Sequence, residues 1–177
     1  RPLKSEQPPF CPIPVLLRTP RMPAIYAHRI VVSQRAIDGQ GHVNNLEYLR
    51  WMQDAAVAHS AAQGWDTARY VESGAGWVVR SHWVEYLQSA LLGDQVTVFT
   101  WVANFRKVRS LRKYRIVREK DGAVLTNAET DWVFIGLEHQ VPRRVPSELI
   151  NAFEVVTDDA LPELAVDCTN RELGRSG

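Results

Sequence analysis

The spacing of hydrophobic residues changes along the chain, and each spacing predicts a different element. From residue 45 to residue 63, apolar side chains recur with the 3.6-residue period of a helix, and Gly64 supplies a residue suited to its end. Alanines in the second half of this helix would let a sheet approach it closely, and we expect His59 to be a hydrogen-bonded core histidine. The predicted buried face contains Tyr48, Leu49, Met52, Ala55, Ala56 and His59.

Later stretches alternate apolar and polar residues with the period of 2 that is typical of strands. A further strand is expected at residues 25–35, before the helix, and a short helix at residues 147–153, after the sheet. One strand, one long helix and a series of hairpins predict an α+β fold, with an antiparallel sheet wrapped around one central helix. The strands expected after the helix span residues 77–87, 95–103, 109–118 and 123–136.

The two ends of the chain lack these periods. Prolines crowd the first 23 residues, which excludes a helix or a central strand there. We therefore expect a Pro-rich extension at residues 1–24, one folded domain at residues 25–155 and an acidic, mobile tail at residues 156–177. The basic excess of the extension leaves open a targeting remnant, although a solvated tail is the simpler interpretation.

Composition and charge narrow the class of protein. The chain has 177 residues, of which 45% are hydrophobic and 23% charged, as is ordinary for one globular domain. A formal net charge of +1 argues against a general role at nucleic acid or a membrane surface, and no apolar run would span a bilayer. Cys11 and Cys168 lack the spacing of a zinc site or a disulfide framework. We expect a cytoplasmic protein without a metal, or a protein of an organelle stroma if the extension is a targeting remnant.

The stretch from residue 37 to residue 48 joins a glycine-rich turn to the long helix and carries the candidate chemistry. Asn44 occupies the N-cap position, and Glu47 completes an Asn version of the capping box. Capping by Asn44 would leave the Asn45 amide free at the positive end of the helix dipole, where it can bind an oxyanion. Asp38 is near enough in sequence for its carboxylate to fold back toward that amide. A carboxylate facing an oxyanion donor is the minimum needed to hydrolyse an ester or thioester.

The run Asp38-Gly39-Gln40-Gly41-His42-Val43-Asn44-Asn45, followed by Tyr48, resembles the signature of the hotdog-fold thioesterases of the 4-hydroxybenzoyl-CoA thioesterase and acyl-CoA thioester hydrolase family. It is also similar to the acyl-ACP thioesterases, which share His-Val-Asn-Asn-x-x-Tyr. The resemblance extends from about residue 26 to residue 153. It implies a single hotdog domain that hydrolyses an acyl-CoA thioester to free acid and CoA without a cofactor, in a site formed between two protomers.

The resemblance also implies roles for single residues. Asp38 would be the catalytic carboxylate, either as a nucleophile or as a general base on water, and the Asn45 amide would polarise the thioester carbonyl. The alternative for Asp38 is a turn residue, because Asp-Gly is common in turns. His42 could hydrogen-bond the loop, polarise the carbonyl or orient Asp38. The expected substrate contacts are Gln40, Gly41 and Tyr48.

Two departures from the family pattern bear on the substrate. Plant-type acyl-ACP enzymes resemble Asp-x-Asn-x-His, and this chain has Gln40 in place of the Asn. CoA is therefore favoured as the carrier, with the acyl carrier protein as the alternative. Many relatives carry Glu-Ala-Arg along the helix, where this chain has Asp54-Ala55-Ala56. An ion pair with Arg50 would account for Asp54 without chemistry.

The densest positive charge of the chain lies between residues 106 and 120. A sheet face covered by the helix could not accept bare guanidinium groups, so some of these side chains must lie at strand ends or on the outer surface. They could be a solvated hairpin or hold the phosphates of CoA at the mouth of the site. Nucleic acid is disfavoured because Tyr114 is the one interleaved aromatic residue. The predicted phosphate contacts are Arg106, Lys107, Arg109 and Arg112, with Arg143 and Arg144 as alternatives.

One helix would leave much of the sheet uncovered, so we expect a homodimer that assembles into a tetramer. Trp77, Trp83 and Trp101 are candidates for burial at an interface or in the core. Two other functions are considered on the same scaffold. A hotdog dehydratase or hydratase would place a proline beside its catalytic residue, which residues 38–45 lack, and the intact Asp38 argues against a non-catalytic acyl-CoA sensor.

Overall fold

The computed structural model describes residues 23–157. Most of the expected extension and tail therefore lies outside the described residues. The elements in chain order are β1 (Tyr26–Val31), the 3-10 helix η1 (Gln34–Ala36), α1 (Asn45–Ala62), α2 (Thr67–Glu72), β2 (Ala75–Tyr86), β3 (Gln95–Phe105), β4 (Arg109–Arg118), β5 (Val124–Gly136) and α3 (Ser147–Ala152).

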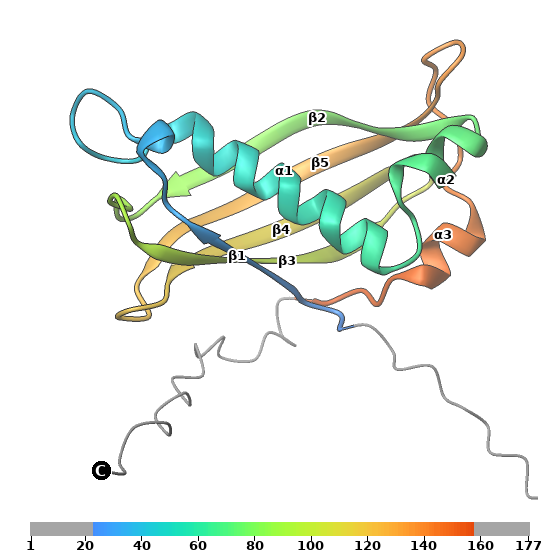
Figure 1. The fold of residues 1–177 in the computed structure, drawn as a ribbon. Coiled ribbons are helices and arrows are strands. Elements are labelled where there is room, and N and C mark those ends of the chain that lie inside the picture. The colour runs from blue at the N-terminus through green and yellow to red at the C-terminus, as the bar shows by residue number, and fades with distance from the viewer. Residues whose placement is uncertain (1–22, 158–177) are drawn as a thin grey trace, which may run out of the picture.

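The strands form one antiparallel, 5-stranded sheet in the order β1-β3-β4-β5-β2. The long helix α1 crosses one face of this sheet, while α2 and α3 lie near one end of it (Figure 1). The predicted α+β architecture, an antiparallel sheet on one long helix, is confirmed. The strand order places β1 and β2 at the two edges, so that each is hydrogen-bonded to one neighbour within the described part of the chain.

The start and end of α1 follow from its capping residues. The side chain of Asn44 accepts a hydrogen bond of 2.9 Å from the Leu46 amide, as an N-cap should. Gly64 follows the helix with φ of 81°, a conformation that favours glycine. The other half of the predicted capping box is absent, because Glu47 lies 3.6 Å from the Arg50 guanidinium. The amide of Asn44 instead donates to the Ala36 carbonyl, at 2.8 Å.

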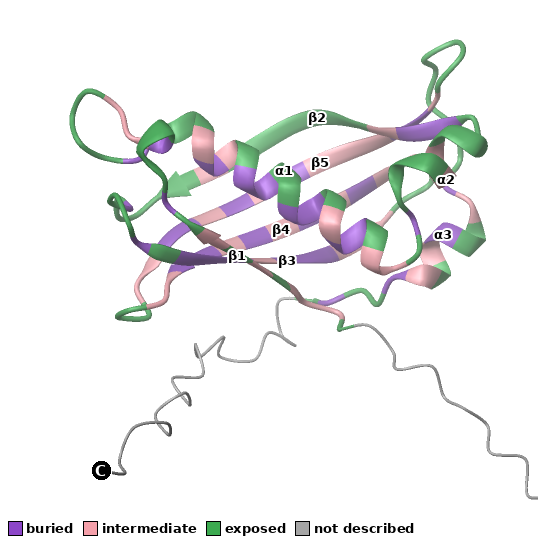
Figure 2. Cartoon of the chain, viewed as in Figure 1, coloured by how far each residue is buried: buried purple, intermediate pink, exposed green. Residues whose placement is uncertain are grey.

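The core lies between α1 and the middle strands. Figure 2 shows buried residues on the inner side of α1 and along β3, β4 and β5, whereas β2 is mostly exposed. Trp51 and Ser60 are buried on α1 in addition to the predicted face. A second cluster closes the end of the sheet near α2 and α3. Its buried members are Trp65, Ala75, Val102, Phe134, Val145, Leu149 and Phe153.

Two local elements differ from the expectation. The strand expected to run to residue 35 ends at Val31, and the chain then turns through η1. The helix α2 was not predicted, because six residues are too few to show a helical period. It begins at the N-cap Asp66, whose side chain accepts a hydrogen bond of 2.9 Å from the Arg69 amide.

Candidate active site

The segment between η1 and α1 is a tight loop that closes on itself. Ile37 and Val43 form an antiparallel bridge at its base, and the Asp38 amide donates to the His42 carbonyl at 2.8 Å. Gly41 has φ of 83°, a left-handed conformation in which a side chain would be strained. The amide of Val43 donates to the Ala90 carbonyl at 3.1 Å and fastens the loop to the segment between β2 and β3. The predicted glycine-rich turn is therefore confirmed.

The Asp38 carboxylate is half-buried, and one of its oxygens accepts hydrogen bonds from amides of the loop. Its Oδ1 accepts hydrogen bonds from the amides of Gln40, at 2.8 Å, and His42, at 3.4 Å. Its Oδ2 makes no hydrogen bond to the described residues. Gln40 and His42 thus position Asp38 through the main chain, and both of their side chains are exposed. The prediction that the His42 side chain orients Asp38 finds no contact to support it.

The amide of Asn45 is available at the N-terminus of α1. The Asn44 cap bonds the Leu46 amide and leaves that of Asn45 without a hydrogen bond inside residues 23–157. Asn45 is exposed, and its N–H lies at the positive end of an 18-residue helix. The Asp38 loop and this amide form one junction at one end of the molecule (Figure 1). We call residues 38–45 the loop–helix junction.

Tyr48 belongs to the core, and its predicted place among the substrate contacts is corrected accordingly. Its side chain is 2% exposed, and its hydroxyl accepts a hydrogen bond of 2.8 Å from the Ala90 amide. Its ring contacts Trp51 and Tyr86, with centroid distances of 5.1 and 5.5 Å. Burial raises the pKa of the phenol. Tyr48 therefore packs in the core next to the loop–helix junction and supports it.

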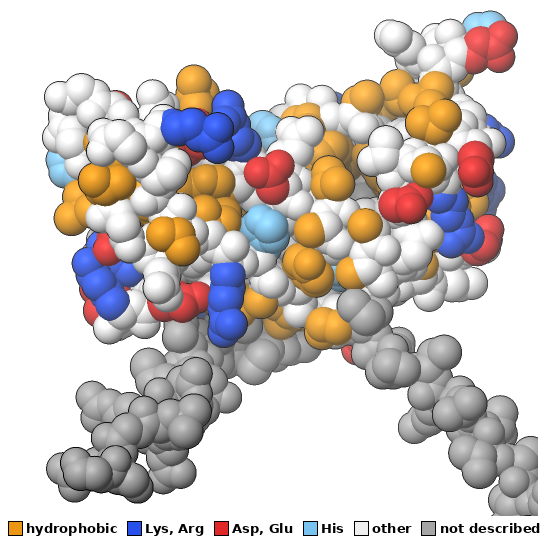
Figure 3. Space-filling view, viewed as in Figure 1, with side chains coloured by type: hydrophobic (Ala, Val, Ile, Leu, Met, Phe, Trp, Pro, Cys, Tyr) orange, Lys and Arg blue, Asp and Glu red, His pale blue; other side chains and the backbone are white. Residues whose placement is uncertain are grey.

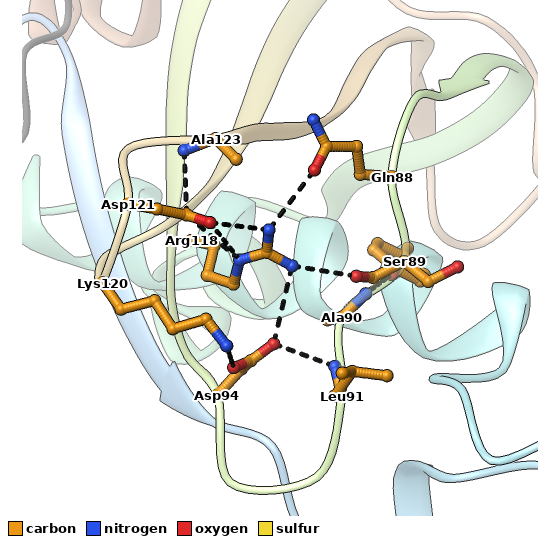
Figure 4. Close-up of polar contacts among 10 residues, drawn as sticks. Gln88, Ser89, Ala90, Leu91, Asp94, Arg118, Lys120, Asp121 and Ala123 are labelled. Carbon is orange, nitrogen blue, oxygen red and sulfur yellow. Dashed lines mark hydrogen bonds and ion pairs between the residues drawn. The ribbon is translucent and has the colours of Figure 1, made fainter.

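A polar network holds the segment to which the loop is fastened (Figure 4). Arg118 contacts Asp121 at 2.8 Å and also donates to the Ser89 carbonyl at 3.2 Å. Asp94 accepts a hydrogen bond of 2.7 Å from Lys120. Burial alone would raise the pKa of Asp94, but the Lys120 hydrogen bond and the charges of Lys120 and Arg118 hold it below its ordinary value. The network joins the β2–β3 and β4–β5 connections and so braces the junction.

Three of the predicted phosphate contacts lie at the turn between β3 and β4. Arg106 and Lys107 are exposed there, and Arg109 lies 3.5 Å from Asp131. This turn and the loop–helix junction are at opposite ends of β3, because Ala90, to which the loop is hydrogen-bonded, comes before that strand. Ten steps of about 3.3 Å separate the two ends by roughly 33 Å. One protomer therefore does not bring the basic turn to its own Asp38. The alternatives, Arg143 and Arg144, are also exposed.

Arg112 lies beneath α1 and not at a surface mouth. Its side chain is 7% exposed, and Nη1 contacts His59 Nδ1 at 2.9 Å and Thr100 Oγ1 at 3.2 Å. Arg112 thus differs from the basic residues at the turn, and its guanidinium is held on the helix-covered face by these hydrogen bonds. Burial, with a smaller contribution from Arg112, lowers the pKa of His59 to about 3, so the imidazole is neutral. The expectation of a hydrogen-bonded core histidine is confirmed, and Gln63 is its second partner at 3.1 Å.

A cavity of about 280 Å³ lies between the second half of α1, α2 and the adjoining ends of the strands. None of Asp38, His42 and Asn45 lines it. Sequence reasoning missed this cavity because it depends on α2 and on the inward position of Arg112. The hydroxyls of Ser60 and Tyr70 meet at 2.9 Å in its wall. The lining residues are Gln53, Ala56, Val57, Ser60, Trp65, Thr67, Tyr70, Val71, Ala75, Gly76, Trp77, Val102, Phe105, Ser110, Arg112, Trp132, Leu137 and Phe153.

The outer edge of β2 is long and unpaired among the described residues, and it exposes several apolar side chains among polar ones. The strand is hydrogen-bonded to β5 alone, and Figure 3 shows hydrophobic side chains at the surface between α1 and β2. Of the three tryptophans considered for an interface, Trp83 is 54% exposed, whereas Trp101 is 2% exposed and belongs to the interior. Trp77 is half-buried. The exposed apolar residues on or just after β2 are Val78, Val79, Trp83, Tyr86 and Leu87.

The sheet order, the single long helix across one face and the loop at its N-terminus define a hotdog-fold domain. The sequence profile of the Thioesterase-like superfamily matches residues 32–153, and the chain belongs to this superfamily. No protein among the curated sequences matches the chain. Within residues 23–157, no helix combines the length and apolar character that a membrane span requires.

Solved structures share this fold. A 1,4-dihydroxy-2-naphthoyl-CoA thioesterase from Synechocystis is 18% identical with a TM-score of 0.67, over 72% of this chain and 94% of that one. A DHNA-CoA thioesterase from Staphylococcus aureus is 24% identical with a TM-score of 0.68, over 72% and 87%. A hypothetical protein from Staphylococcus aureus in complex with CoA is 16% identical with a TM-score of 0.69, over 78% and 90%. At these identities the likeness shows the fold.

Proposed function

We propose that this protein is a thioesterase that hydrolyses an acyl-CoA thioester to free acid and CoA. The observation that carries the proposal is the loop–helix junction, where a carboxylate with one unbonded oxygen and an unbonded helix-terminal amide belong to one short loop. Membership of the Thioesterase-like superfamily supports it. So do the CoA thioesterases and the CoA complex among the structures of the same fold.

Two groups of the loop–helix junction, the Asn45 amide and the Asp38 carboxylate, would have different roles in the reaction. The Asn45 amide and the α1 dipole would bind the thioester oxygen as it gains negative charge. Asp38 would use Oδ2, because Oδ1 is held by the loop amides. It would either attack the carbonyl carbon to form an anhydride that water then hydrolyses, or take a proton from the attacking water. In both routes the C–S bond breaks and the thiolate leaves with CoA.

The free edge of β2 supports a homodimer in which two chains share each site. A long, unpaired edge strand with exposed apolar side chains is a template for pairing with another strand, and a two-fold axis through its middle would pair it with its own copy. The Ala75 end of one strand would then meet the Tyr86 end of the other. Because the cavity lies at the Ala75 end and the junction at the Tyr86 end, each cavity would open beside the partner subunit's Asp38.

The same symmetry would bring the basic turn to the end of the dimer where the partner's loop–helix junction lies. Arg106, Lys107 and Arg109 lie at the opposite end of β3 from their own junction, and a two-fold axis would place them at the same end as the partner's junction. They would then bind the CoA phosphates of a substrate whose thioester lies at that junction. Assembly of two such dimers into a tetramer remains a prediction.

A thiol-release assay with aromatic, short-chain and long-chain acyl-CoAs tests the function. We expect the wild type to release CoA and the Asp38→Asn variant to lose about 10²- to 10⁴-fold in kcat. Glu129→Gln is the matched control, since that carboxylate lies in the middle of β5, away from both ends of the sheet. Full turnover by Asp38→Asn would refute the assigned role. Enoyl-CoA hydration, acyl-ACP hydrolysis or tight acyl-CoA binding without turnover would each favour one of the alternatives.

A further inference from the structure

We propose that the cavity beneath the second half of α1 holds the acyl group of the substrate, and that Arg112 there selects acyl groups that end in a carboxylate. The inference rests on the proposed function and adds the class of acyl group. Four observations carry it: the missing counter-charge of Arg112, the donors that it leaves free, the apolar walls of the cavity and the position of the cavity in the dimer.

The first observation is a buried cation without an anion. Arg112 is 7% exposed, and its partners, the His59 ring and the Thr100 hydroxyl, are uncharged. No carboxylate pairs with it within residues 23–157. A buried charge left unpaired is costly, and a bound carboxylate would supply the missing counter-charge.

The second observation concerns the donors that remain. Both hydrogen bonds of the Arg112 guanidinium use Nη1, which fixes the group and leaves Nε and Nη2 without hydrogen bonds to the described residues. Two adjacent N–H donors on a planar group match the two oxygens of a carboxylate. The Phe153 ring, 5.8 Å from Cζ, packs beside the group and further restricts it.

The third observation is the character of the cavity. Arg112 is the one charged side chain among its described lining residues, and the walls around it include Ala56, Trp65, Val102 and Phe105. The volume of about 280 Å³ exceeds the ~150 Å³ of a cavity that holds benzene. A chain of several carbons would fit. The site therefore suits an apolar body with an anion at its far end, which is an ω-carboxyacyl group.

The fourth observation is the direction of approach. In the proposed dimer the cavity lies beside the partner subunit's Asp38, with Ala75 and Trp77 of β2 in its wall. An acyl group whose thioester sits at the partner's junction would extend past β2 toward Arg112. The carboxylate would then be at the end of the acyl group remote from the reacting carbonyl.

Matched acyl-CoAs test the inference. Octanedioyl-CoA, its neutral methyl ester and octanoyl-CoA differ only at the remote end, and the same trio built on hexanoyl and decanoyl chains covers other lengths. We expect the wild type to prefer the free carboxylate in kcat/KM by about 10- to 100-fold in at least one trio, as hydrogen bonds to charged groups would give. Arg112→Met should abolish that preference while retaining turnover of the neutral acyl-CoA, and Arg112→Lys should keep part of it.

Arg29→Met is the matched control, because that arginine is 81% exposed on β1 and should leave the preference unchanged. Equal or lower kcat/KM for the carboxylates in every trio, or a preference that survives in both Arg112→Met and Arg112→Gln, would overturn the inference. If no acyl-CoA is hydrolysed, the proposed function fails separately. Calorimetric binding of octanedioyl-CoA against octanoyl-CoA, in wild type and Arg112→Met, then decides whether the cavity selects a carboxylate.

Discussion

The hydroxyl of Tyr86 donates a hydrogen bond of 3.2 Å to the carbonyl oxygen of Asn45, which joins the last residue of β2 to the first residue of α1. The proposed dimer edge and the proposed oxyanion donor are therefore in direct contact. Tyr86 also packs edge-on against the buried ring of Tyr48. Pairing of β2 with a second chain would order the same residue that positions the junction.

Removal of this hydroxyl should affect turnover more than folding. We expect Tyr86→Phe to lower kcat by about 3- to 10-fold and to change the free energy of unfolding by no more than about 1 kcal/mol, since one exposed hydrogen bond is lost and the ring is kept. Steady-state kinetics and chemical denaturation measure the two effects. An unchanged kcat would show that the contact does not position Asn45.

The conformation of Gly41 gives a second prediction. Its φ of 83° is strained for any residue with a side chain, although a Cβ there would meet no atom within 4 Å. Gly41→Ala should therefore destabilise the protein by about 1–2 kcal/mol through backbone strain alone, and should lower activity by displacing the loop amides from Asp38. Gly39→Ala is the matched control, because Gly39 is equally uncrowded and lacks a positive φ. Equal effects of the two changes would contradict this account.

The sequence was most informative where a period or a cap acts locally. The bounds of β4 were predicted as Arg109–Arg118 because alternation fills the strand and turns flank it, and Asn44 marked the start of α1. The loop that contains Asp38 could likewise be predicted from its glycines. The separation of the loop from the basic turn could not be predicted. Only the arrangement of the strands shows that the two lie at opposite ends of the sheet.

The inward position of Arg112 could not be predicted from the sequence either. Alternation along β4 assigns it to one face, but a buried guanidinium is tolerated only because His59 and Thr100 accept its hydrogen bonds. These partners come from α1 and β3, so they are recognisable only once those elements are packed. The Ala90 amide that donates to the Tyr48 hydroxyl could not be predicted for the same reason, although the helical period placed Tyr48 on the buried face.

The buried His59 should make stability depend on pH. Its pKa is lowered from 6.5 to about 3 in the folded protein, so the unfolded chain binds the extra proton between these values. Its contribution to stability is therefore fully present above pH 6.5 and is lost as the pH falls toward 3, with a slope of up to about 1.4 kcal/mol per pH unit.

The His59→Asn variant isolates this contribution. It should be less stable than wild type at pH 7.5, because a packed, hydrogen-bonded ring is lost, and the difference should shrink as the pH is lowered from 6.5 to about 4.5. Urea denaturation at a series of pH values gives both curves. Parallel curves over this range would show that His59 is not kept neutral by the fold.

The edge of β2 should control assembly. Val79→Lys places a charge near the middle of β2, where a two-fold pair of strands would bring two such charges together. We expect this variant to elute as a monomer of 20.1 kDa and to lose hydrolysis along with the shared site. Val31→Lys is the matched control on the opposite edge, since Val31 is 64% exposed on β1. A fully active monomeric variant would disprove the shared site.

Mixed dimers separate a shared site from one built within a single chain. One variant, Asp38→Asn, lacks the carboxylate, and the other, Arg106→Glu with Lys107→Glu, lacks the basic turn; both should be nearly inactive at low acyl-CoA concentration. If each site takes Asp38 from one subunit and the turn from the other, a mixed dimer keeps one intact site of its two. Random pairing of equal amounts should then restore about a quarter of wild-type activity, whereas sites built within one chain would give no restoration. Co-expression with two affinity tags, followed by isolation of the mixed dimer, makes the comparison direct.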